Sequence, residues 1–374
     1  MRLDGIAAAA PHLIERLEHF RTFTMAHPRL VAARDELMDA IDGATPGSLI
    51  LVLGPTGVGK TTLRLKAESV LGQQMPPSPG RLPFVSLDVP PPHAMRFSWR
   101  DYFSRLLVAM DEPLIDAKTG RLATGTPPAR SIAIGSDLSY AAEQALRYRR
   151  PPVVFVDEAQ HLARIASGRR LSDQLDVIKS IANRTGTVHV LLGTYEFLAF
   201  RNLSAQLSRR CLDLHFQRYR ADAEAERQVF QNVLLTFQKQ LPFPEAEVDL
   251  VAMWDFLYER SVGCVGILKE WLLRACVRSI RHGAPTLTKE NLEHTALAIS
   301  QCEKILAESR EGEMRLNDGE DARMRFRTSA GLAPGADKAA KPATTTTSAK
   351  TAKVGQRSPH RDPIREVGVA AAYA

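Results

Sequence analysis

The clearest chemistry in the sequence lies in the segment GPTGVGKT, residues 54–61, which matches the pattern G-x-x-x-x-G-K-[ST] at every fixed position. Glycines at these places let backbone N–H groups turn inward around a phosphate at the start of the following helix. Lys60 would then contact the β- and γ-phosphates, and the Thr61 hydroxyl would bind Mg²⁺. The pattern predicts a site for ATP and Mg²⁺ formed by Gly54, Pro55, Thr56, Gly57, Val58, Gly59, Lys60, Thr61 and Thr62.

Two carboxylates, Asp157 and Glu158, follow an apolar run in the segment VVFVDEAQ, residues 153–160. An aspartate at the end of a buried strand can hold Mg²⁺ through its water shell, and the adjacent glutamate can orient and deprotonate an attacking water. In a chain with a phosphate loop, this pair predicts an ATPase. Thr194 ends the apolar segment VHVLLGT, so its hydroxyl could bond the γ-phosphate or the attacking water; alternatively it only begins a loop.

Two adjacent arginines, Arg209 and Arg210, precede another strand pattern in the segment LSRRCLDLHF. Leu212, Leu214 and Phe216 alternate there with polar residues, which predicts a strand with one buried face. The arginines could form ion pairs at the surface of their own fold, or they could reach a group outside it.

Strands and helices alternate between about residues 46 and 220, which predicts an α/β fold with a mostly parallel sheet flanked by helices. Two helices broken at His27-Pro28 are expected within 12–42, and a long loop is expected within 111–135. The expected strands cover 48–54, 82–89, 153–156, 187–194 and 211–216, and the expected helices cover about 61–71, 97–110, 137–150, 172–184 and 196–208.

The character of the sequence changes twice towards its C-terminus. A helical pattern without strands covers about 221–306, and beyond Arg310 large apolar residues become scarce. Residues 338–365 carry seven lysines and arginines against one aspartate, so burial cannot offset the cost of ordering them. This tail is either a solvated terminus or an arm for DNA or a partner. We expect an N-terminal helical segment (1–45), an α/β core (46–220), a small all-α domain (221–308) and a disordered basic tail (309–374).

The composition fits a soluble globular protein, because 44% of the 374 residues are hydrophobic and 24% are charged. No run of about 18 apolar residues could span a membrane, and Pro11 interrupts the apolar start, so no signal peptide is expected. The net charge of +7 is compatible with nucleic-acid binding but is weak evidence for it. The scattered cysteines form no C-x-x-C pair, which favours the reducing cytoplasm: Cys211, Cys264, Cys276 and Cys302.

The order of these motifs resembles that of the AAA+ ATPases, and the all-α segment after them is similar to the lid of that class. The expected fold is therefore an α/β P-loop NTPase of AAA+ type, a parallel sheet flanked by helices and followed by a small all-α lid. The SRRC sequence is similar to the S-R-C motif of clamp loaders, whose arginine enters the ATP site of the neighbouring subunit. The resemblance implies that Arg210, directly before Cys211, is an arginine finger, with Arg209 as the alternative.

A narrower resemblance is to the TniB and TnsC transposition regulators, relatives of the MuB and ExeA types, and it covers about residues 20–305. It rests on HPRLVAARDELMDAI, on VDEAQHL, on LLGTYEFLAF with LSRR, and on SVGCVGILKEWLLRA. Members of this family are ATPases that assemble with ATP on target DNA and recruit or activate a transposase. One departure concerns a lid arginine of many AAA+ proteins: Gly266 takes its place, and Lys269, one turn later, is the candidate substitute for nucleotide binding.

The resemblance implies a cytoplasmic ATPase that regulates transposition, forms a ring or helical filament on double-stranded DNA and hydrolyses ATP to disassemble. Implied partners are further copies of the chain, a transposase, and a target-selection protein or CRISPR effector, with no membrane. The alternatives are an AAA+ ATPase that assembles on a protein, such as a secretion or replication-loading factor, and a nucleotide-gated scaffold with little hydrolysis. Cations spaced among glycines and threonines suit phosphate contacts, and the candidate DNA contacts are Arg96, Arg100, Lys118, Arg121 and Arg130.

Overall fold

The structure is a computed structural model that places the chain in two compact units, Met1–Asn317 and Asp318–Ala374. The described residues are 11–75, 78–92, 97–113, 115, 131–162, 169–198, 211–243, 249–284, 286–317 and 319–332.

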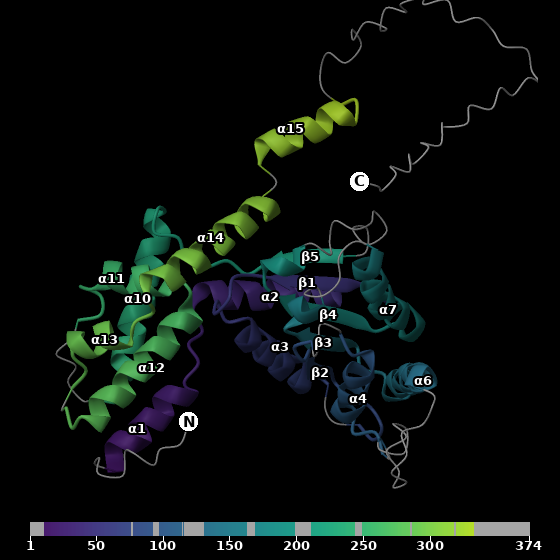
Figure 1. Ribbon diagram of the computed structural model, residues 1–374, viewed down its shortest axis with the longest axis horizontal. Coiled ribbons are helices and arrows are strands. Elements are labelled where there is room, and N and C mark those ends of the chain that lie inside the picture. Colours follow the sequence, from purple (N-terminus) through teal and green to yellow (C-terminus); the bar gives the residue numbers. More distant parts are fainter. Residues whose placement is uncertain are drawn as a thin grey trace, which may run out of the picture. The chain divides into compact units, whose positions relative to one another are not determined.

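Five parallel strands form one sheet in the order β2-β3-β4-β1-β5 (Figure 1). The strands are β1 (Leu49–Leu53), β2 (Val85–Asp88), β3 (Val153–Asp157), β4 (Val188–Gly193) and β5 (Cys211–His215). Their register brings carboxyl ends together, since Leu53 pairs with Gly193 and Asp88 pairs with Asp157. The predicted parallel α/β fold is therefore confirmed, and the candidate phosphate loop and the carboxylate pair both follow strands at the same edge of the sheet.

Helices cover both faces of this sheet: α2 (Pro28–Asp42), α3 (Lys60–Gln74), α4 (Trp99–Ala109), α6 (Ser131–Arg149) and α7 (Arg169–Thr185). Successive residues of a strand point to opposite faces of the sheet, so their side chains pack against two different sets of helices. Leu51 and Val154 pack with α4, α6 and α7, whereas Val52 and Phe155 pack with α2 and α3. A strand with both faces buried must be apolar at nearly every position, which explains why all five residues of β1 and of β3 are buried.

Two local predictions were wrong. Helix α6 begins at Ser131 instead of residue 137, inside the expected loop, because a single glycine such as Gly135 costs a helix only about 1 kcal/mol and does not end it. Leu212 was expected to be buried with Leu214 and Phe216, but it is 53% exposed. Leu214 and Phe216 enter the α2 and α3 layer, while Leu212 lies on the edge strand, where no described residue covers it.

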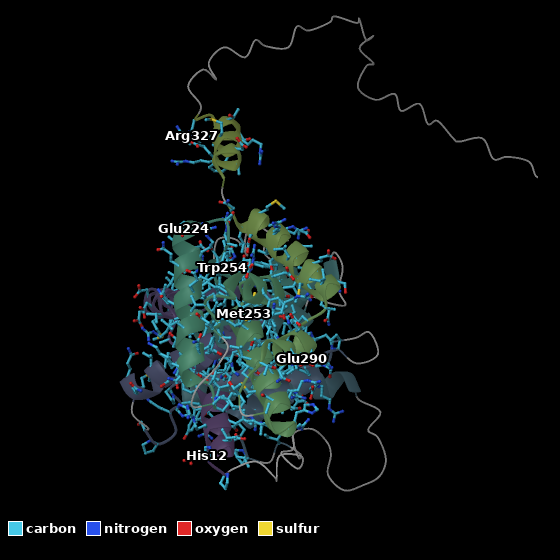
Figure 2. The ribbon with its side chains drawn as sticks, turned by 90° about the vertical axis from the view of Figure 1, so that its left-hand side faces the viewer. His12, Glu224, Met253, Trp254, Glu290 and Arg327 are labelled. Carbon is cyan, nitrogen blue, oxygen red and sulfur yellow. The ribbon has the colours of Figure 1, made fainter. Side chains whose placement is uncertain are left out.

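The C-terminal helical part of the first unit contains α10 (Glu224–Gln240), α11 (Trp254–Ser261), α12 (Val265–Arg281), α13 (Lys289–Thr295) and α14 (Ile299–Leu316). These helices share an apolar cluster that includes Phe237 and Trp271, and Met253 and Trp254 are partly buried against it (Figure 2). Helix α1 (Pro11–Thr22) also belongs to this cluster through Leu17 and lies beside α12 (Figure 1). The first two helices therefore separate, because α1 packs on the helical part and α2 packs on the sheet.

Helices extend into the region 309–374, where a disordered tail was expected. Helix α14 continues to Leu316, and a further helix, α15 (Glu320–Ser329), lies in the second unit. The end of α14 is ordered by two contacts with the α/β core. Gly312 packs so closely on Tyr195 that an added Cβ atom would lie 2.0 Å from its ring. Arg218 donates hydrogen bonds of 2.9 and 3.2 Å to the two carboxylate oxygens of Glu313.

The sequence could not reveal these contacts, because both partners lie far away along the chain. The residues beyond 332, which include the basic stretch 338–365, lie outside the described part of the chain. None of the described helices is long and apolar enough to cross a membrane.

We predict that Glu313→Ala lowers the free energy of unfolding by about 3 kcal/mol, because it leaves the buried Arg218 guanidinium without its carboxylate. Glu311→Ala is the matched control on the same helix, since its pair with Arg315 is about 60% exposed on both sides and should contribute less than about 1 kcal/mol. Urea unfolding followed by circular dichroism measures both losses. Equal midpoints for the two variants would show that the Arg218–Glu313 pair does not anchor α14.

Candidate nucleotide-binding site

The loop between β1 and α3 has the backbone geometry that a phosphate site requires. Gly57 and Gly59 have φ angles of 69° and 114°, which residues with a Cβ atom rarely adopt. Gly54 lies against the backbone of Phe216, so that a Cβ atom on Gly54 would lie 2.4 Å from the Phe216 carbonyl oxygen. Glycines at these positions therefore let the loop fold tightly in front of the N-terminus of α3, where backbone N–H groups favour an anion.

Lys60 is the first residue of α3 and is buried, with 9% of its surface exposed. Its Nζ donates hydrogen bonds to the carbonyl oxygens of Gly54 at 3.0 Å and Pro55 at 2.8 Å. Burial lowers the pKa of Lys60 to about 8, although the carboxylates of Glu158 and Asp157 oppose this shift. A buried ammonium group held by neutral carbonyls is suited to an anionic ligand that restores charge balance.

Asp157 is a deeply buried acid of the site: it is 2% exposed, and its carboxylate accepts hydrogen bonds from three donors. Its Oδ2 accepts a hydrogen bond from the Thr61 hydroxyl at 2.9 Å and another from Arg64 Nε at 3.2 Å. Its Oδ1 accepts a hydrogen bond of 2.9 Å from the backbone N–H of Glu158. The structure thus brings Thr61 and Asp157 together as the sequence predicts.

The sequence interpretation missed Arg64, which is the charge partner of Asp157. Its side chain is 12% exposed and also pairs with Glu68 at 2.8 Å and with Asp88 at 3.5 Å. Arg64 stands four residues after Lys60 in α3, so both side chains project from the same face of the helix. That spacing was visible in the sequence, but the acids that gather around the guanidinium come from three different elements.

The residues present fit a magnesium ion. Thr61 Oγ1 and Asp157 Oδ2 lie within hydrogen-bonding distance, so both oxygens can face one small cation. Among the described residues no group of three or more His, Cys, Asp or Glu side chains could hold a metal by itself. Mg²⁺ commonly takes one or two protein oxygens and completes its shell with phosphate and water, which is the ligand set available here.

Glu158 is connected to the end of β4 through Gln160, another residue that the sequence interpretation missed. Gln160 Nε2 donates a hydrogen bond to Glu158 Oε2, and Gln160 Oε1 accepts one of 3.2 Å from the backbone N–H of Thr194. Glu158 has a φ of 55°, a conformation that residues other than glycine rarely adopt. The hydroxyl of Thr194 is buried and has no hydrogen-bond partner among the described residues, so it is free to bond a ligand.

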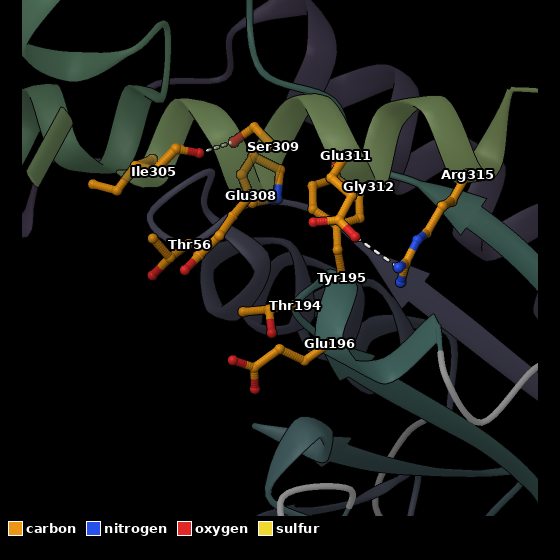
Figure 3. Close-up of a pocket in the computed structure, with 11 residues that line it drawn as sticks. Thr56, Thr194, Tyr195, Glu196, Ile305, Glu308, Ser309, Glu311, Gly312 and Arg315 are labelled. Carbon is orange, nitrogen blue, oxygen red and sulfur yellow. Dashed lines mark hydrogen bonds and ion pairs between the residues drawn. The ribbon is translucent and has the colours of Figure 1, made fainter. Parts of the chain in front are cut away.

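A cavity of about 590 Å³ opens over these residues. Its walls come from the phosphate loop, from the ends of β3 and β4, and from the helical part. The lining residues are Thr56, Gly57, Gly59, Lys60, Thr61, Thr62, Glu158, Gln160, His161, Thr194, Glu196, Gly266, Glu270, Lys304, Ile305 and Glu308. A second cavity of about 240 Å³ lies between Thr56, the segment after Thr194 and α14, with Glu196 and Glu308 on its walls (Figure 3).

The helical part contacts the phosphate loop at the start of α12. The backbone N–H of Ile267 donates a hydrogen bond of 3.2 Å to the carbonyl oxygen of Gly57. A Cβ atom on Gly266 would lie 2.5 Å from the same oxygen, so glycine permits this close approach where a lid arginine was expected. Lys269 does not replace that arginine, contrary to the prediction. Its Nζ donates a hydrogen bond of 2.9 Å to the carbonyl oxygen of Arg21 in α1, and it does not line the cavity.

Most of the other cations chosen from the sequence lie outside the described residues: Arg96, Lys118, Arg121, Arg130, Arg209 and Arg210. Arg100 is described and lies exposed at the start of α4. Its proposed contact with DNA stays a prediction.

The sheet, the phosphate loop and the Thr61–Asp157 contact define a P-loop ATPase of α/β type. Residues 44–201 match the family described as AAA domain. The chain therefore carries an AAA-type ATPase domain. No curated protein is significantly similar to the chain in sequence.

Several solved structures are similar to this chain at low identity. The Aeropyrum pernix ORC2 protein in its ADPNP-ADP complexes is 16% identical, with a TM-score of 0.46 over 74% of this chain and 67% of that chain. Drosophila ORC bound to DNA is 14% identical, with a TM-score of 0.45 over 77% and 66%. The Thermotoga maritima RuvB Holliday junction branch migration motor is 16% identical, with a TM-score of 0.36 over 71% and 67%. At this similarity none of their activities can be transferred to the chain.

We predict that Arg64→Met, measured without nucleotide, lowers the free energy of unfolding by about 3 kcal/mol, because Asp157 and Glu68 lose their buried cation. Added Mg²⁺ should restore part of this free energy, because the ion can take the place of the lost guanidinium beside the Asp157 carboxylate. It should therefore stabilise the variant more than the unchanged protein. Lys66→Met is the control, because Lys66 is exposed on the same helix and its loss should cost less than about 0.5 kcal/mol. An equal Mg²⁺ effect in all three proteins, measured by thermal unfolding, would contradict the role of Arg64.

Proposed function

We propose that this chain is an ATPase that assembles with ATP on duplex DNA and regulates transposition by recruiting or activating a transposase. The geometry of β5 is the observation that carries the assembly step. Cys211, the residue after Arg210, pairs with Leu49 at the amino end of β1, whereas the phosphate loop follows Leu53 at the carboxyl end. Four steps of a strand span about 13 Å, so Cys211 lies at the amino edge of the sheet, opposite to the edge that carries the phosphate loop.

This placement favours a role for Arg210, or Arg209, in the ATP site of a neighbouring copy. Each site would then be complete only between two subunits, and ATP would promote a ring or a helical filament. The transposition role is supported by the sequence segments that resemble the TniB and TnsC regulators, among them VDEAQHL and SVGCVGILKEWLLRA. A basic net charge of +7 supports nucleic acid as the surface on which the copies assemble.

The roles of the site residues follow from their contacts. Lys60 and the phosphate-loop N–H groups hold the phosphates, and Thr61 and Asp157 bind the magnesium ion, which would neutralise charge on the β- and γ-phosphates. Glu158 orients and deprotonates the attacking water, while Gln160 fixes its carboxylate relative to β4. The free hydroxyl of Thr194 bonds the γ-phosphate or that water.

We predict that DNA binding requires ATP, is insensitive to sequence, and weakens with salt at a log-log slope of about −0.9 per neutralised phosphate. Lys60→Ala should abolish it, because the phosphates lose their buried ammonium partner. Lys66→Ala, which removes an exposed lysine from the same helix, should leave it unchanged. Fluorescence anisotropy with labelled duplexes measures all three proteins. DNA binding that Lys60→Ala retains would favour a scaffold, and ATP hydrolysis without any DNA binding would favour assembly on a protein.

The trans role of Arg210 predicts rescue between two inactive variants. Arg210→Ala keeps its own ATP site but should lose hydrolysis by about 10³–10⁵-fold, the contribution of an arginine finger. Lys60→Ala cannot hold nucleotide but keeps Arg210. A mixture can form interfaces with an intact site on one subunit and an intact arginine on the other, so part of the ATPase rate should return.

Repeating the mixture with Arg209→Ala decides which arginine acts. Crosslinking of the mixed subunits is the control that both variants enter one assembly. If they co-assemble and neither mixture regains hydrolysis, the proposed arginine finger is wrong.

A further inference from the structure

Helix α14 lies over the nucleotide cavity and contributes three side chains to its wall: Lys304, Ile305 and Glu308. Ile305 and Glu308 extend from this helix on the side of Thr56 in the phosphate loop (Figure 3). Residues four apart in a helix share a face, so Lys304 projects from α14 in the same direction as Glu308. A helix outside the expected core thus forms part of the ATP site.

The position of α14 is fixed by contacts just beyond this face. Gly312 lies against the ring of Tyr195, which directly follows Thr194 at the end of β4. Glu313 accepts two hydrogen bonds from the guanidinium of Arg218. The Gly312–Tyr195 contact and the Arg218–Glu313 ion pair therefore fix the position of α14, and with it the position of the Lys304 backbone, relative to Thr194.

The charges around the cavity leave Lys304 available for an anion. Lys60 and Lys304 are its only lysine or arginine side chains among the described residues. Lys60 is occupied by two carbonyl oxygens, whereas Lys304 is exposed and has no hydrogen bond or ion pair in the described part of the chain. No ion pair joins Lys304 to Glu308, one turn away, in the part of the chain that the structure describes. The Lys304 ammonium therefore keeps its full capacity to bind phosphate.

Carboxylates around the cavity favour a second cationic side chain beside a bound triphosphate. Glu158, Glu270 and Glu308 line the cavity, and Glu270 pairs with Arg274 at 2.9 Å. A triphosphate adds further negative charge to this acidic surrounding. Helix α12 offers no compensating side chain at its start, since Gly266 touches the phosphate loop and Lys269 contacts α1.

We propose that Lys304 binds the terminal phosphate of ATP and that α14 thereby reports whether the nucleotide carries a γ-phosphate. We assign Lys304 to the terminal phosphate because it lines the same cavity as Glu158 and Thr194, which lie at the ends of β3 and β4. This inference rests on the nucleotide-binding part of the proposed function and is independent of DNA and of transposition.

The test is the affinity of Lys304→Ala for fluorescent analogues of ATP and ADP in the presence of Mg²⁺. ATP binding should weaken by about 10- to 100-fold, the effect of one hydrogen bond between charged groups, while ADP binding changes by less than about twofold. Lys304→Arg should restore most of the ATP affinity. Arg310→Ala is the matched control, because it removes one positive charge from α14 on a side that faces another cavity, beside Arg218.

Unchanged ATP affinity in Lys304→Ala would overturn the proposal, and so would an equal loss for ATP and ADP or the same loss in Arg310→Ala. Thermal unfolding without nucleotide shows whether each variant is folded, and Lys304→Gln replaces Lys304→Ala if the latter is not. Failure of the unchanged protein to bind ATP would instead overturn the proposed function. The two failures are therefore distinguishable in one experiment.

Discussion

The hydrogen bond between the Thr61 hydroxyl and the Asp157 carboxylate is the contact on which the rest of the site depends. It joins the start of α3 to the end of β3, two elements far apart in the sequence. The parallel order of the sheet makes this possible, because the chain segments that follow β1, β3 and β4 must all lie at one edge. Arg64 completes the arrangement, since a carboxylate with 2% exposure would be costly without a cation beside it.

The same edge of the sheet couples the ATP site to the C-terminal helical part. Helix α12 touches the phosphate loop through Gly57 and Gly266, while α14 touches the end of β4 through Tyr195 and Gly312. A ligand that occupies the cavity between them must interact with both parts, so its binding can favour one arrangement of the helices over another. Nucleotide-dependent assembly needs such a link between the bound phosphate and the surface of the molecule.

The sequence predicted what depends on local pattern. The apolar runs of β1 and β3, the glycines of the phosphate loop and the pair Asp157 and Glu158 all carry signals within a few residues. It could not predict that Gln160 bonds the backbone of Thr194 or that Lys304 lines the cavity, because each depends on chain segments more than thirty residues away. The sequence also provided no means of placing the Lys269 side chain. The position of a residue along a helix does not show which neighbouring element its side chain faces, and Lys269 faces α1 instead of the cavity.

The proposed assembly of this chain on duplex DNA with ATP can be observed by electron microscopy of the protein with duplex DNA, Mg²⁺ and a slowly hydrolysed ATP analogue. We expect regular rings or filaments around the DNA, with nucleotide between adjacent subunits and an arginine from the neighbour beside its γ-phosphate. Single subunits on DNA, or an identical assembly with ADP, would contradict it.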